Sequence, residues 1–193
     1  MKKAFLLVLI LFVSVISTAC INNLAVQELN NKAKTYLDSG DYENAIGRLK
    51  SSIDLDSTLF ETHYNLGIAY TQAEKYPEAV ETFQNAIKLR PSFADTYYSL
   101  AVAQENYAQG IVSGTLKTDD KDSAKANTDD APAVEKKLTK EEKAQVAQLL
   151  NDSIASYSTY LEKGKEINDK QDVEQKIEYL KTQVLKYAPA NAE

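Results

Sequence analysis

The segment DYENAI at Asp41–Ile46 returns as KYPEAV at Lys75–Val80, 34 residues further along the chain. The same offset carries Leu49 onto Phe83. A unit of about this length is typical of a pair of helices, which cannot bury its apolar face alone and must stack on its neighbours. The repeat therefore predicts a solenoid with one concave face, and favours a binding scaffold over a catalyst.

Apolar residues recur at three- and four-residue spacing through the chain, and glycine and proline fall at the expected helix boundaries. Pro77 stands at a helix start, where its missing N–H costs nothing, and Ser92 is positioned to cap the fifth helix. We expect five helices at about residues 24–38, 42–55, 58–72, 77–89 and 93–109.

The pattern breaks at residues 110–138, which are rich in Asp, Lys, Ser, Thr and Ala. Such a segment buries too little apolar surface to offset the entropy of ordering it. It is either an acidic and polar insertion within a repeat or a linker between two domains. The insertion is favoured because Ser153–Leu161 repeats the spacing of Ala79–Ile87.

Residues 139–188 are therefore expected to hold the second helix of the third repeat and a final helix. Thr139–Glu142 has the pattern of a capping box, which marks a helix start. From about residue 169 to 186, one apolar stripe faces a polar surface. This is what a solenoid requires of a helix that caps its open end.

Residues 1–19 have the pattern of an export signal, with two lysines, an apolar run and small residues before Cys20. Ser17-Thr18-Ala19-Cys20 resembles the lipobox of bacterial lipoproteins, which implies that Cys20 is acylated, for example with palmitate, and becomes the first residue. Because an aliphatic residue is usual where Ser17 stands, a secreted soluble protein is the alternative. Cys20 is also the sole cysteine, so no intrachain disulfide forms.

The charge of the chain argues against nucleic acid. The formal net charge is −6, and removing the signal with its two lysines leaves 20 basic and 28 acidic side chains, or −8. An acidic body cannot neutralise a phosphate backbone, and it does not suit anionic lipid. Membrane attachment would therefore depend on Cys20.

The sequence has few of the residues that catalysis, metal binding or phosphate binding requires. His63 is the single histidine and stands at a packing position, so neither a catalytic triad nor a metal site is expected. The six glycines are scattered, without a phosphate-binding loop. We expect no enzyme activity, no cofactor and no metal.

The second repeat resembles the tetratricopeptide repeat (TPR). The resemblance extends over about residues 24–186 and implies an all-α helix-turn-helix solenoid of about three repeats with a C-terminal capping helix. The residues that carry it are His63-Tyr64-Asn65-Leu66-Gly67, Tyr70, Tyr76, Ala79, Phe83, Ala86, Leu89 and Pro91.

In this family, ligands lie along the first helix of each repeat. No Lys or Arg occurs from Pro91 to Leu116, so a clamp for an acidic peptide tail is not expected. The apolar and aromatic positions suit a peptide or helix laid in a groove, unless they fill gaps between helices instead. The positions that correspond to the groove are Asn30, Lys34, Tyr64, Asn65, Ile68, Tyr98, Val102 and Glu105.

Together these features predict a lipid-anchored TPR adaptor in the bacterial cell envelope that binds an unidentified protein or peptide and serves the assembly of an envelope complex. It would face the periplasm or the cell exterior. Ile21 stands after the cysteine instead of the aspartate that retains some lipoproteins at the inner membrane, which favours the outer membrane. The alternative is a self-associating structural protein of the envelope.

Overall fold

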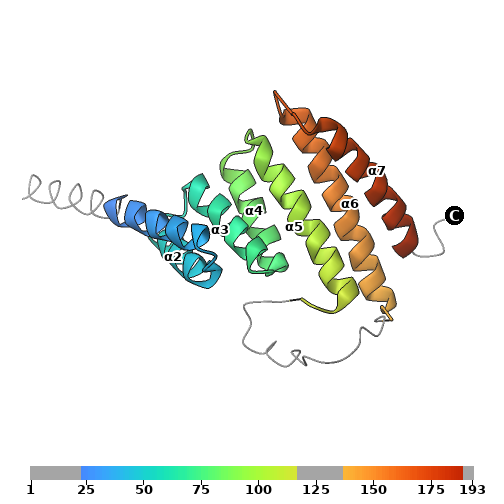
Figure 1. The fold of residues 1–193 in the computed structure, drawn as a ribbon, viewed down its shortest axis with the longest axis horizontal. Helices are drawn as coiled ribbons and strands as arrows, with labels where there is room; N and C mark the ends of the chain where they lie inside the picture. Colours follow the sequence, from blue (N-terminus) through green and yellow to red (C-terminus); the bar gives the residue numbers. More distant parts are fainter. Residues whose placement is uncertain (1–22, 117–136, 189–193) are drawn as a thin grey trace, which may run out of the picture.

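The computed structural model describes residues 23–116 and 137–188, which form helices joined by short turns (Figure 1). Cys20 and most of the insertion lie outside these residues. No described helix is both long enough and apolar enough to span a membrane. The expectation of an all-α solenoid is confirmed. The helices are 23–38, α2 (Tyr42–Leu55), α3 (Phe60–Gln72), α4 (Tyr76–Leu89), α5 (Ala94–Ser113), α6 (Lys140–Lys163) and α7 (Lys170–Tyr187).

Each helix packs on the next one in the chain, so the helices form a row from the N-terminal to the C-terminal end (Figure 1). The helices α3 and α5 also contact each other directly, as the first helices of consecutive repeats. A row of this kind has two ends and no contacts between distant repeats. Its stability comes from the interfaces between neighbouring helices.

Local signals explain most of the helix boundaries. Gly40 has φ 77°, a left-handed conformation that ends the first helix, and Asp41 accepts a hydrogen bond from the Asn44 N–H at the start of α2. The predicted capping box at the start of α6 is present, because the Thr139 and Glu142 side chains each accept from the other's backbone N–H.

The predicted cap of the fifth helix at Ser92 is wrong. The helix α5 begins at Ala94 with Phe93 as its N-cap residue, and no side chain caps it. The Phe93 ring instead packs edge-on against Phe60, with ring centroids 5.2 Å apart, and against Tyr64 at 5.7 Å. At the start of α5, ring packing thus stands where a side-chain cap was expected.

A close approach of α3 and α4 defines the second repeat. A Cβ atom on Gly67 would lie 2.6–2.8 Å from three atoms of the Phe83 ring, so only glycine allows this spacing. Phe83 is fully buried beside Leu49 and Leu66 in the core of the first two repeats. His63 lies on α3, 9% exposed, and its Nε2–H donates to the Ser57 carbonyl oxygen over 2.9 Å.

The third repeat is interrupted but complete. The Ser156 hydroxyl on α6 donates to Gln104 Oε1 on α5 over 2.9 Å, and the two helices pack along each other. The core that α5 and α6 share favours an insertion within one repeat over a linker between two independent domains. A second core, with Val146, Leu150 and Val173 among its members, joins α5, α6 and α7.

The third helix pair is longer than the second. The 34-residue offset places the equivalent of Gln72, where α3 ends, at Asn106, yet α5 continues to Ser113. Gly110 and Ile111 are buried there. The interruption therefore begins after the expected boundary at residue 110, because the first residues beyond it pack on the second core.

Candidate binding groove

The helix α5 carries a strip of side chains along one face, in which Val102 is half-buried and packs against the second core. Asp95, Tyr98, Val102, Glu105 and Gln109 follow one another at three- and four-residue spacing, which places them on one helix face. Tyr98 is 37% exposed. Three of the predicted groove residues therefore share one surface.

Two tyrosines of α6 hold the Tyr98 ring in place. Tyr157 and Tyr160 both meet it edge-on, at centroid distances of 5.5 and 5.2 Å and interplanar angles of 74° and 64°. Edge-to-face pairs of this kind are favourable because the positive ring edge meets the negative ring face. The three rings form a fixed aromatic cluster, which we call the Tyr98 cluster.

Carboxylates surround the Tyr98 cluster. The Tyr160 hydroxyl donates to Asp169 at the start of α7 over 3.0 Å, and the Tyr157 hydroxyl donates to Glu105 over 3.5 Å. Burial, together with Asp169 and Asp95, raises the pKa of the Tyr160 phenol to about 12. Burial and the Glu105 carboxylate likewise raise the pKa of Tyr157.

Glu105 connects the strip to the last helix. Lys176 Nζ on α7 lies 3.0 Å from Glu105 Oε1 and forms an ion pair with it. Between α5 and α7 lies a hollow of about 130 Å³. Its polar and apolar lining includes Glu105, Gln109, Val112, Tyr179, Gln183 and Tyr187.

The predicted groove residues of α3 are half-buried, as Val102 and Glu105 are, whereas Tyr98 is exposed. Tyr64 stacks on Phe60 at 5.7 Å and meets Phe83 edge-on at 6.0 Å. Ile68 is half-buried and packs on the core of the first two repeats, and Asn65 is half-buried as well. On this helix the aromatic and apolar positions mainly fill space between helices.

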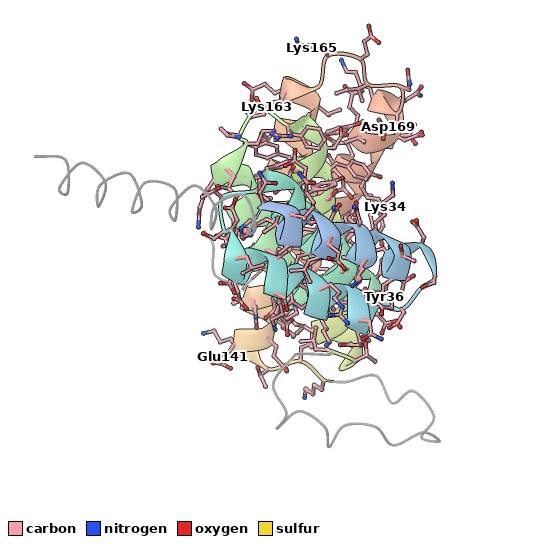
Figure 2. The ribbon with its side chains drawn as sticks, turned by 90° about the vertical axis from the view of Figure 1, so that its left-hand side faces the viewer. Lys34, Tyr36, Glu141, Lys163, Lys165 and Asp169 are labelled. Atoms are coloured by element: carbon pink, nitrogen blue, oxygen red, sulfur yellow. The ribbon has the colours of Figure 1, made fainter. Side chains whose placement is uncertain are left out.

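The predicted groove residue Asn30 is engaged in hydrogen bonds within and between helices. Its Nδ2 donates to the Val26 carbonyl over 2.9 Å and to the Ser52 hydroxyl over 2.8 Å, while its Oδ1 accepts from the Thr62 hydroxyl over 3.2 Å. Asn30 thereby joins the first helix to α2 and α3. The remaining predicted residue, Lys34, lies exposed on the first helix, which is at the opposite end of the row from α6 and α7 (Figures 1 and 2).

The structure thus brings Tyr98, Val102 and Glu105 together on one strip and places Tyr64 and Ile68 on the adjacent helix α3. It adds four residues that the sequence analysis did not select: Tyr157, Tyr160, Asp169 and Lys176. Of these, Tyr157 could have been found from the sequence, because it occupies the position in the third repeat that Phe83 occupies in the second. Within the described residues, no group of three or more His, Cys, Asp or Glu side chains is arranged to hold a metal ion.

A helical solenoid with an exposed strip on one helix face defines a class of binding scaffolds. The TPR repeat family profile matches residues 33–73 and 69–107. Residues 33–107 therefore belong to the tetratricopeptide repeat family.

Several solved structures share this fold. The first TPR of Spaghetti (RPAP3), bound to the HSP90 peptide SRMEEVD, has a TM-score of 0.58 and 16% identity, covering 82% of this chain and 94% of that chain. The Arabidopsis OM64 TPR domain has a TM-score of 0.57 and 10% identity, covering 82% and 98%. The second TPR domain of human RPAP3, in complex with the HSP70 peptide SGPTIEEVD, has a TM-score of 0.57 and 16% identity, covering 81% and 98%. No curated protein sequence matches the chain.

Proposed function

We propose that this protein is an adaptor that binds a segment of a partner protein along the strip of α5, and that a lipid on Cys20 holds it at a membrane of the bacterial envelope. The exposed and fixed ring of Tyr98 is the observation that carries the binding proposal. An aromatic side chain that is already ordered loses little further entropy when a partner covers it. Rigid aromatic residues are common anchors of protein interfaces.

The similar structures support the peptide-binding part of this proposal, because two of them hold a peptide. Both peptides end in the acidic sequence EEVD. The helix α5 offers such a peptide no cation, since no Lys or Arg lies between Pro91 and Leu116. We therefore propose a different peptide chemistry on the same scaffold.

Crosslinking in intact cells tests the binding proposal. A photo-crosslinking amino acid at Val102 should capture a partner, and the same group at Ser51, an exposed position of α2, should not. Tyr98→Ala should reduce the capture at Val102. The matched control is Leu89→Ala on α4, because Leu89 is 40% exposed and Tyr98 is 37% exposed. Equal capture by both variants would exclude the strip as the binding surface.

The lipid anchor has its own test. Cys20 directly follows Ser17-Thr18-Ala19, as a lipobox cysteine does. Labelled palmitate should enter the wild-type protein, and Cys20→Ser should shift the protein out of the membrane fraction or leave the signal uncleaved. Failure of the label to enter the wild type would contradict the anchor and leave the binding proposal untouched.

Self-association is a second candidate function. Leu24 on the first helix is 69% exposed, and Leu185 on α7 is 79% exposed, at opposite ends of the row (Figure 1). Apolar side chains at both ends suit end-to-end contacts between copies. Sedimentation over a range of protein concentrations separates the candidates, because a scaffold of this kind would associate and lose that association in Leu185→Glu.

A further inference from the structure

The surface around Tyr98 is acidic, because it carries the carboxylates of Asp95 and Asp169. Asp95 lies one turn before Tyr98 on the same face of α5 and has no ion-pair partner among the residues that the structure describes. Asp169 receives the Tyr160 hydroxyl and, within the same described part of the chain, no cation. Asp169 is held against the cluster by its hydrogen bond from the Tyr160 hydroxyl, and Asp95 lies one turn before Tyr98 on α5.

Three lysines at this end of the row contact other groups, among them Lys170, which pairs with Glu174 at 3.8 Å, whereas the exposed Lys165 forms no ion pair among the described residues. Lys176 is paired with Glu105 at 3.0 Å. Lys163 lies over the ring of Tyr97, 5.5 Å from its centroid, so it faces a different tyrosine of α5. The Tyr98 cluster therefore combines an exposed ring with two carboxylates that no lysine or arginine neutralises.

We propose that the Tyr98 cluster binds an arginine or lysine side chain of the partner, so that the bound segment is basic. This inference rests on the proposed function, since it names the chemistry of the segment that occupies the strip. The face of an aromatic ring attracts a cation through its quadrupole. Asp95 and Asp169 add charge-assisted hydrogen bonds, for which the planar guanidinium of arginine is well suited.

The same arrangement disfavours an acidic segment. A carboxylate over Tyr98 would meet the negative face of the ring and the like charges of Asp95 and Asp169. Arginine or lysine is thereby selected both by attraction and by exclusion of the opposite charge. Glu105 is a third carboxylate on the strip. A second basic residue of the partner can bind the Glu105 carboxylate in place of Lys176.

The test uses a defined probe, a displayed library of random twelve-residue peptides, selected on the purified full-length protein. Selected peptides should be enriched in Arg and Lys, and their binding should weaken with added salt. The double variant Asp95→Asn, Asp169→Asn keeps the size of both side chains and should bind these peptides about fivefold more weakly or worse. The control is Glu178→Gln, an exposed acid of α7 paired with Lys181.

The outcomes separate this inference from the proposed function. Neutral or acidic peptides that lose binding in Tyr98→Ala would overturn the basic-segment inference and preserve the adaptor. Basic peptides that bind the double variant as well as wild type would also overturn the inference. Selected peptides that are insensitive to Tyr98→Ala would overturn the proposed binding surface itself. Unchanged thermal unfolding of each variant confirms that the comparison concerns folded protein.

Discussion

The side-chain hydroxyl of Ser153 donates a hydrogen bond of 2.9 Å to the backbone carbonyl of Ala101. Both atoms are buried, and the two residues are separated by 52 positions in the sequence. Ala101 stands in the repeat phase of Gly67, and Ser153 takes the place of Ala79 in the third repeat. This contact fixes the register in which α6 returns to α5.

Replacing residues 117–136 with a short Gly-Ser linker should leave the thermal unfolding of the protein nearly unchanged. The closure entropy of a loop changes by only about 0.6 kcal/mol for each doubling of its length. The control is a wider replacement of residues 110–138, which removes buried Ile111 together with Leu116 and Leu138, both packed on the second core. That control should unfold at a clearly lower temperature. An equal loss in both variants would show that residues 117–136 contribute to the core.

Asn30→Ala should lower the free energy of unfolding by about 1–3 kcal/mol, because the buried Ser52 and Thr62 hydroxyls lose their shared partner. Urea denaturation measures this difference. Asn31→Ala is the matched control, since it makes the same change one residue away at an exposed position. If the two variants were equally stable, the hydrogen bonds of Asn30 would not contribute to the junction of the first three helices.

Gly67→Ala should destabilise the protein by about 1–3 kcal/mol, since the new methyl group would overlap the Phe83 ring. Gly47→Ala should have the opposite effect. A Cβ atom at Gly47 meets nothing within 4 Å, and alanine is favoured over glycine in a helix by about 1 kcal/mol. Denaturant unfolding of the pair therefore separates helix propensity from packing. Stabilisation by both substitutions would contradict the close approach of α3 and α4.

Alkaline pH should destabilise the protein through Tyr160. Its folded-state pKa of about 12 exceeds the ordinary 10.0, so the folded state favours the neutral phenol. The associated stability is fully present below about pH 10 and is lost as the pH rises through about 12. Tyr160→Phe should reduce this loss, whereas Tyr179→Phe, at a 55% exposed position, should not. Chemical denaturation at several pH values measures it, and identical pH profiles of the two variants would contradict the buried environment of Tyr160.

The helices could be predicted from the sequence because the residues that begin and end them lie within or next to each helix. The helix α2 begins at Tyr42 and ends at Leu55 as predicted, since Gly40 and Asp41 mark its start within a few residues. The start of α5 was predicted to within a residue, but its cap was not, because no side chain caps the helix and the Phe93 ring packs on Phe60 and Tyr64 there. Local pattern could not reveal that packing.

The candidate site was only partly predictable for a related reason. Tyr98, Val102 and Glu105 followed from the repeat phase. Lys176 did not, because α7 carries no recognisable repeat and its contact with Glu105 spans 71 positions. Asn30 was assigned to the groove by phase alone, although its hydrogen bonds show an asparagine satisfied between helices.

The unequal lengths of the helix pairs have a consequence for folding. The helices α5 and α6 have 20 and 24 residues, whereas α3 and α4 have 13 and 14. In a one-dimensional array, stability is close to a sum of single-repeat and neighbour-interface contributions, so the longest packed pair of helices should be the most stable. We expect amide hydrogens in the middle of α5 and α6 to exchange slowest with solvent and those of the first helix fastest. The N-terminal repeat, which lies nearest to Cys20, would then open and close while the strip on α5 keeps its shape.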